Sequence, residues 1–122
     1  MILTDLPYRS LAIVRGSDRD AALQTVLTLA GEGITASEVT LTTDDALWVI
    51  EQARRELGHE ALIGAGPVLS VDDAARAADA ALAAGAVAVG AGSPLIGDGG
   101  DQAALRARAA QWRTALTRAV TA

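Results

Sequence analysis

Four short apolar runs recur along the chain at nearly even intervals, with helical segments expected between them. The runs begin at positions 11, 36, 61 and 87, about 25 residues apart, which is the length of one strand followed by one helix. Between them, apolar residues return with the period of an α-helix, as in 21–29 and 46–57. The predicted strands are 11–14, 35–41, 61–65 and 86–90, and the predicted helices are 18–30, 44–57, 71–84 and 101–120.

Polar residues mark the expected ends of these helices. Each of the first three helices starts near a hydroxyl residue that has an acid three positions later, which places oxygen and negative charge beside the free N–H groups of the first turn. The pairs are Ser17 with Asp20, Thr42 with Asp45, and Ser70 with Asp73. Helices are expected to end at Gly31, Gly33 and Gly85, where a left-handed residue is favoured.

The order of the elements predicts the fold class. Strands that are apolar on both faces and joined by helices belong to a parallel sheet covered by helices. Four βα units in 122 residues are too few for a closed (βα)8 barrel, which needs about 200 residues or more. We therefore expect an α/β fold in a single domain, 1–122, that forms half of a TIM barrel; a small flavodoxin-like open sheet is the alternative. The open first and last strands of a half-barrel predict a homo-oligomer.

Composition limits the classes of partner. The chain has 15 acidic residues against 10 basic ones and a formal net charge of −5. This balance argues against nucleic acid and against anionic membrane surfaces, because binding to phosphate groups needs clustered basic residues. With no cysteine in the chain, neither a disulfide nor a thiolate metal site can form. Because no signal peptide or membrane span is recognisable either, we expect a cytoplasmic protein.

Candidate chemistry lies where the apolar runs end, since ligands bind at the carboxyl ends of the strands in parallel α/β folds. Glu38 stands inside the second run, where a carboxylate is costly to bury unless it is paired, and alternation places it on the same face as Thr40. Arg15 directly follows the first run. Glu38 is therefore interpreted either as a catalytic or ligand-binding residue, or as the salt-bridge partner of Arg15 on the neighbouring strand.

Short glycine loops are expected after the third and fourth runs. Such loops either admit an anion to backbone N–H groups or simply form tight strand-to-helix turns, and neither loop continues into a dinucleotide-binding motif. Their candidate residues are Gly64, Gly66, Gly90, Gly92 and Ser93. The only histidine, His59, is expected at the amino end of a strand and so away from this site.

Three of these segments, taken in order, resemble one enzyme family. The segments Leu11–Gly16, Ser37–Thr43 and Leu62–Leu69 together resemble the 2-keto-3-deoxy-6-phosphogluconate (KDPG) and 4-hydroxy-2-oxoglutarate (KHG) aldolases. The resemblance implies a class I aldolase of the Entner–Doudoroff type of sugar-acid catabolism. In that family a trimeric TIM barrel carries a lysine that forms a Schiff base with pyruvate. The resemblance also implies that Glu38 is the acid/base and that Arg15 binds the substrate carboxylate.

The C-terminal stretch resembles a different part of the same barrel. Residues 85–95, followed by the helical segment 104–116, are similar to the last strand and helix of the family. The resemblance thus joins two blocks, 1–80 and 85–122, that four further strands separate in the family. It implies that pyruvate or a small phosphorylated 2-keto acid is bound, with phosphate at the last strand. The implied substrate-binding residues are Arg15, Thr40, Gly64, Gly66, Gly90, Gly92 and Ser93.

One departure from the family decides which chemistry is expected. All 10 basic residues are arginine, so no lysine can form the Schiff base, and the only primary amine is the N-terminus. Pro67 also stands where the family has threonine. We expect a shortened family member that is inactive as an aldolase by itself. No organic cofactor or metal is expected, because one carboxylate at this edge makes a poor metal site. Two alternatives stay open, a non-catalytic module that binds phosphate or an oxo-acid, and a gene remnant that only folds.

Overall fold

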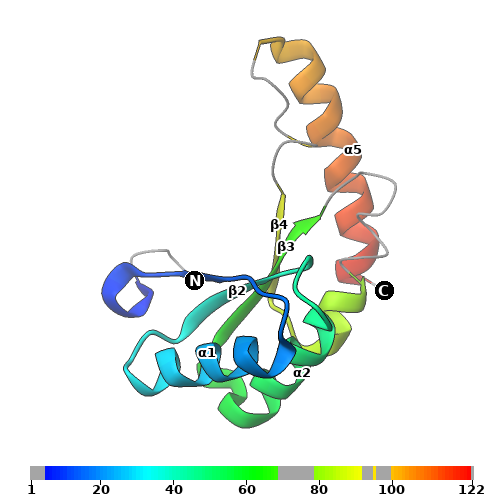
Figure 1. Cartoon of the computed structure of the whole chain (residues 1–122). Coiled ribbons are helices and arrows are strands. Elements are labelled where there is room, and N and C mark those ends of the chain that lie inside the picture. The colour runs from blue at the N-terminus through cyan, green and yellow to red at the C-terminus, as the bar shows by residue number, and fades with distance from the viewer. Residues whose placement is uncertain (1–4, 69–78, 92–94, 96–99, 122) are drawn as a thin grey trace.

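Strands and helices alternate along the chain in the computed structural model, which describes residues 5–68, 79–91, 95 and 100–121 (Figure 1). Residues 79–84 are helical; the first part of the predicted third helix, 71–78, lies outside the described residues. The labelled elements are η2 (Pro7–Arg9), β1 (Ala12–Val14), α1 (Arg19–Gly31), β2 (Ala36–Thr40), α2 (Ala46–Leu57), η3 (Gly58–Glu60), β3 (Leu62–Val68), β4 (Ala88–Ala91) and α5 (Gln102–Thr121).

The four strands form one parallel sheet in the order β1-β2-β3-β4. Glu38 of β2 pairs with Ile13 of β1 and with Gly64 of β3, which in turn pairs with Ala88 of β4. Neighbouring strands are therefore consecutive in the sequence, as in a TIM barrel, whereas a flavodoxin-like sheet reverses its strand order near the first strand. The expectation of a partial TIM barrel is confirmed, and the flavodoxin-like alternative is wrong.

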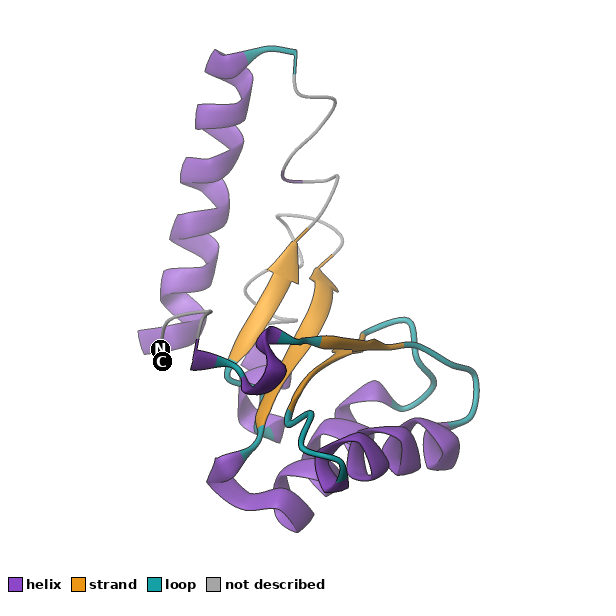
Figure 2. Cartoon of the chain, turned by 90° about the vertical axis from the view of Figure 1, so that its left-hand side faces the viewer, coloured by secondary structure: helices purple, strands orange, loops and turns teal. Residues whose placement is uncertain are grey.

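The sheet has one covered face and one open face. α1 and α2 lie side by side against the covered face (Figure 2), where Val39 and Ile63 are fully buried with Val26 and Ile50 in a core of aliphatic side chains. Because side chains alternate across a strand, Glu38 and its pairing partners point to the other face. In a closed barrel that face would be the interior.

The largest difference between a predicted and an observed strand boundary is at the end of β3. The apolar run predicts an end at 65, whereas the strand continues to Val68. Gly66 stays in the ladder, since its carbonyl accepts a hydrogen bond from Leu41 N at 2.8 Å. The sequence pattern missed this continuation because glycine and proline are normally read as turn residues.

Two of the predicted helix caps are wrong. α1 is capped by Asp18 instead of Ser17, and the Asp18 carboxylate accepts two N–H groups of the first turn. α2 begins after Asp45, which has a φ of 53° and makes no side-chain cap hydrogen bond. Thr42 is not the cap because its hydroxyl donates to a neighbouring threonine instead. The third predicted pair, at 70 and 73, lies outside the described residues.

Arg54 connects the segment before β4 to the segment before β3. Its Nε donates to Gly85 O at 3.0 Å, and its Nη1 donates to Ala61 O at 2.8 Å and to Gly58 O. Gly85 has a φ of 117°, and a Cβ there would lie 2.9 Å from Arg54 Cγ. The position therefore requires glycine for its backbone conformation and for this close approach. One guanidinium thus holds three backbone carbonyls in place.

Candidate functional site

Glu38 lies on the open face of the sheet and leans across the glycines of the neighbouring strands. A Cβ added to Gly66 of β3 would lie 2.6 Å from Glu38 Oε1, and one added to Gly90 of β4 would lie 2.9 Å from the same oxygen. A Cβ on Gly64 would lie 4.0 Å from Glu38 Cγ. The missing side chains at Gly66 and Gly90 therefore provide the space that the carboxylate occupies.

All three glycines are strand residues, as the predicted strands 61–65 and 86–90 imply for Gly64 and Gly90, whereas the prediction of Gly66 in a loop after the strand is wrong. Gly64 and Gly66 lie inside β3, and Gly90 lies inside β4. Glycine weakens a strand unless something approaches its backbone closely, and here the approaching group is the carboxylate of Glu38. The physical reason for the glycines is thus contact with a side chain from β2, which only the pairing of the strands brings to them.

The surroundings of Glu38 are mostly apolar. Glu38 lines a hollow of about 200 Å³. The walls of this hollow include Leu6, Leu11, Leu62 and Val87. Glu38 is partly buried, and no hydrogen bond or ion pair joins it to another residue in the part of the chain that the structure describes. The alternative prediction of a salt bridge with Arg15 is therefore not borne out among these residues.

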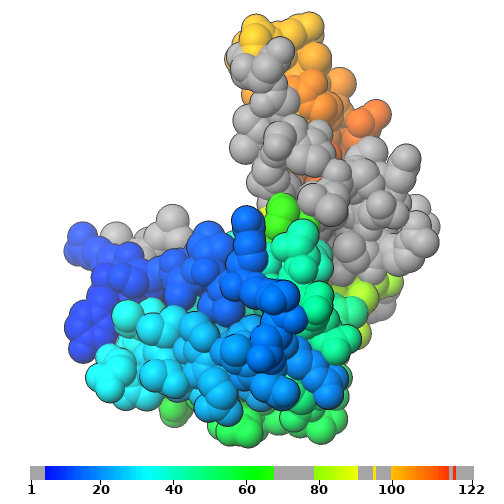
Figure 3. Space-filling view, in the orientation of Figure 1, coloured from blue at the N-terminus to red at the C-terminus, as the bar shows by residue number. Residues whose placement is uncertain are grey.

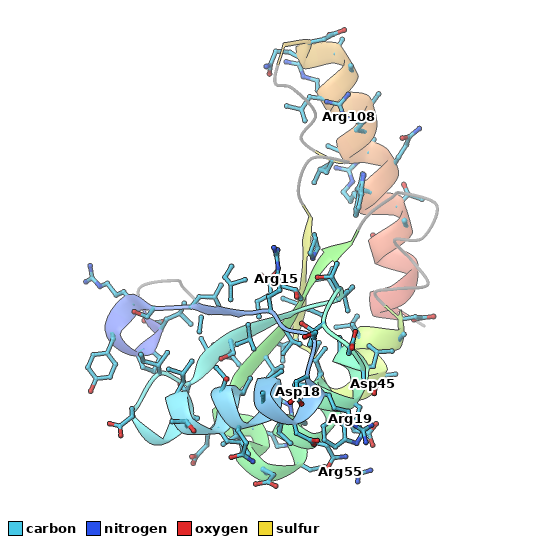
Figure 4. The ribbon with its side chains drawn as sticks, in the orientation of Figure 1. Arg15, Asp18, Arg19, Asp45, Arg55 and Arg108 are labelled. Atoms are coloured by element: carbon cyan, nitrogen blue, oxygen red, sulfur yellow. The ribbon has the colours of Figure 1, made fainter. Side chains whose placement is uncertain are left out.

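Arg15 is exposed directly after β1, at the carboxyl edge of the sheet (Figure 4). It lines a separate hollow of about 270 Å³ together with Gly16, Ser17 and Asp18 at the start of α1. The guanidinium carries a positive charge at any physiological pH. Arg15 and Glu38, the two charged residues predicted for the site, are thus contributed by adjacent strands. Arg15 follows the end of β1 whereas Glu38 lies inside β2, so Arg15 is nearer to the carboxyl edge of the sheet.

Three threonines connect the loops at this edge. Thr42 donates its hydroxyl hydrogen to Thr40 Oγ1 at 3.2 Å, and Thr40 Oγ1 lies 2.9 Å from Thr43 Oγ1. Thr43 Oγ1 also accepts a hydrogen bond from Gly16 N at 3.3 Å. Thr40 and Thr43 are both buried. The Thr43 hydroxyl therefore holds the loop after β2 against the loop after β1, and the Thr40 hydroxyl positions Thr43, a structural role that the sequence pattern did not predict.

Several predicted site residues can be placed and others cannot. Gly92 and Ser93, which the resemblance assigns to a phosphate site, lie outside the described residues. His59 is exposed in η3, at the amino end of β3 and so at the far end of the sheet, as predicted. Groups of His, Cys, Asp and Glu that could hold a metal ion are absent from the described ranges. Within the same ranges, no helix has the length and hydropathy needed to cross a membrane.

A cluster beside α2 was not anticipated from the sequence. Arg19 Nη1 donates to Asp45 Oδ2 at 3.3 Å, and the Arg19 guanidinium lies 4.3 Å from the centre of the Trp48 ring. Asp45, Trp48 and Leu47 also line a hollow of about 390 Å³. The spacing of Asp45 and Trp48 on one turn is visible in the sequence, but their meeting with Arg19 depends on the packing of α1 against α2.

Comparison with known proteins identifies the family. No curated protein sequence gives a significant match. The family model for the KDPG and KHG aldolases matches residues 6–105, which include β1 to β4 and both glycine-bearing strands beneath Glu38. The match covers most of the chain, so this protein belongs to the KDPG and KHG aldolase family.

Proposed function

We propose that this chain binds a 2-keto acid such as pyruvate, or a small phosphorylated 2-keto acid, and does not turn it over by the class I aldolase mechanism by itself. One observation carries the second half of the proposal, namely that all 10 basic residues are arginine. The first half rests on membership of the aldolase family and on the space kept around Glu38 by Gly66 and Gly90.

The chemistry of the class I reaction explains why lysine matters. A neutral primary amine must attack the keto carbon, and water must leave, before the carbon–carbon bond can break to give pyruvate and an aldehyde. Arginine cannot act as this nucleophile, because its guanidinium stays protonated in proteins. His59 could not replace it either, since it lies at the amino end of β3. Covalent catalysis depends on its nucleophile, and binding groups alone cannot replace the rate enhancement that the nucleophile provides.

The residues that are present favour binding of a small anion. Arg15 supplies positive charge for the ligand's carboxylate at the carboxyl edge. Glu38 would then face the keto end, where its carboxylate can accept a hydrogen bond from a hydroxyl group of the ligand or hold a proton. The apolar walls around Glu38 would exclude water from that end.

We also infer that the protein acts in the cytoplasm, because a chain without cysteine makes no use of an oxidising compartment.

Two measurements test the claim of inactivity. Pyruvate release from KDPG is followed through a coupled dehydrogenase, with a heat-killed sample as the control. Turnover near one per second would overturn the claim of inactivity. Mass spectrometry after borohydride treatment with pyruvate is expected to find no trapped adduct on an internal residue, because only an amine forms a reducible Schiff base.

Binding is measured by thermal shift and by calorimetry with pyruvate and with inorganic phosphate. We expect Arg15→Gln to weaken the binding of pyruvate about tenfold or more, which corresponds to the loss of a charge-assisted hydrogen bond. Arg55→Gln is the matched control, because Arg55 is an exposed arginine on α2 that pairs with Glu51, one turn earlier. If pyruvate and phosphate both fail to bind, or if the two variants bind equally, the proposed ligand site is wrong.

A further inference from the structure

Both outer strands of the sheet have one side without a partner strand. In the described part of the chain, β1 pairs only with β2 and β4 pairs only with β3. All four strands run in the same direction. The free side of β4 is therefore complementary to the free side of another parallel β1, and such open edges are normally covered in native proteins.

Apolar side chains lie exposed next to these two edges. Leu11 and Ile13, at β1, are 48% and 64% exposed, and Val87, just before β4, is 57% exposed. Leu11 and Val87 also line the hollow beside Glu38. Burial of large apolar side chains contributes about 1.5–3 kcal/mol each, so leaving them in water at an open edge is unfavourable.

The C-terminal helix lacks a strand to cover. α2 packs across β2 and β3, the strand before it and the strand after it, as helices do in (βα) barrels. By the same rule α5 should cover β4 and a further strand beside it, and the described residues form no such strand. α5 accordingly makes no contact of similar extent with any strand of the sheet, and its first turns stand beyond the body of the molecule (Figure 3).

We propose that the open side of the sheet binds a second copy of this chain, and that the two copies close an eight-stranded parallel barrel around a two-fold axis. β4 of each copy pairs with β1 of the other, so both seams are the same, and each α5 covers the seam that its own β4 forms. β2 and the partner's β2 are then four strands apart on opposite walls. The Glu38 site is complete only in this dimer, because the open face becomes the barrel interior.

Light scattering coupled to size exclusion tests the proposal on the 122-residue chain. We expect a mass of twice 12.4 kDa at micromolar concentration. A monomer would overturn the proposal. Species much larger than a dimer would overturn it too, because they would show open head-to-tail pairing instead of a closed ring.

Variants at each edge test which surface makes the contact. Ala88 and Val89 of β4 pair with Gly64 and Ala65 of β3, and Ala88 O lies 3.5 Å from the position of a Cβ on Gly64, so the backbone groups of Ala88 point to β3. Because backbone groups of successive residues point to opposite sides of a strand, the N–H of Val89 points to the free side, and Val89→Pro removes it while the ladder bonds of Ala88 to β3 stay in place. Ile13→Lys places a charge on the open face of β1, where the closed barrel would bury it. Leu47→Lys is the matched control, because Leu47 is an exposed leucine on α2.

The expected pattern distinguishes edge pairing from general stickiness. Each edge variant alone should be a monomer with an unchanged circular dichroism spectrum, and the control should stay a dimer. When the two edge variants are mixed in equal amounts, one seam of a mixed dimer contains two intact edges, so part of the dimer mass should return. If both edge variants remain dimeric, or if Leu47→Lys alone dissociates the protein, the contact lies elsewhere and the proposal is wrong.

Discussion

The contact between Glu38 and the glycines beneath it can be tested by adding single methyl groups at positions where the structure gives different amounts of space. A Cβ on Gly66 would lie 2.6 Å from Glu38 Oε1 and also 2.9 Å from the backbone nitrogen of Gly90. The three atoms nearest to a Cβ on Gly90 would all belong to the Glu38 side chain, the nearest at 2.9 Å. A Cβ on Gly64 would find its nearest atom, Ala88 O, at an ordinary 3.5 Å.

These distances predict three different changes in the free energy of unfolding. Gly64→Ala should stabilise the protein by about 0.5–1 kcal/mol, because alanine loses less backbone entropy than glycine on folding. Gly66→Ala should destabilise it by about 1–3 kcal/mol, because both a side chain and a backbone segment must move. Gly90→Ala should fall between the two, since only a flexible side chain must give way.

Urea denaturation followed by circular dichroism measures these differences directly, and the melting temperature should shift by roughly 3–5 °C per kcal/mol for a chain of this size. Glu38→Ala separates the two contacts in a double-mutant cycle. In the Glu38→Ala background, the loss of stability caused by Gly90→Ala should disappear almost completely. The loss caused by Gly66→Ala should disappear only in part, because its new methyl group would still meet the backbone of Gly90. If Gly66→Ala and Gly64→Ala have the same stability, Glu38 does not rest on these glycines and the reasoning is refuted.

Three further substitutions test contacts away from Glu38. Arg54→Met should cost about 2–4 kcal/mol in urea denaturation because it leaves three backbone carbonyls without their donor, whereas Arg55→Met should change stability by less than about 1 kcal/mol. Thr43→Val should cost about 1–2 kcal/mol through the loss of a buried acceptor, and Thr43→Ser should restore most of it. Asp18→Ala should lower the free energy of unfolding by about 1 kcal/mol because it removes the cap of α1, whereas Ser17→Ala should leave it unchanged. If Ser17→Ala were the more destabilising change, Ser17 would be the cap.

The fold was predictable because its signals are local. The starts of the apolar runs gave the four βα units, and the strands found at β1, β2 and β4 lie within two residues of the predicted ones. The end of β3 was missed because Gly66 and Pro67 look like a turn when they are read alone. Hydrogen bonding to β2, through Leu41 N and Gly66 O, overrides that local preference, and no pattern within one segment can show it.

The site was only partly predictable for a related reason. Residue type and strand alternation indicated Glu38, and the position after β1 indicated Arg15. The role of the glycines depends on which strands are neighbours, since Gly66 and Gly90 meet Glu38 from two other strands. The hydrogen bonds of Thr40 and Thr43 likewise depend on how two loops are brought together.

The sequence by itself determined which side chains are available for chemistry and the units from which the protein is built. The absence of lysine is a matter of composition, and the helix and strand periods are matters of spacing, so neither needs a third dimension. Only the tertiary structure decided that β1 to β4 lie in sequence order, that one face stays open, and that the glycines make room for a carboxylate. These features depend on contacts between residues far apart in the chain, which only strand pairing and helix packing bring together.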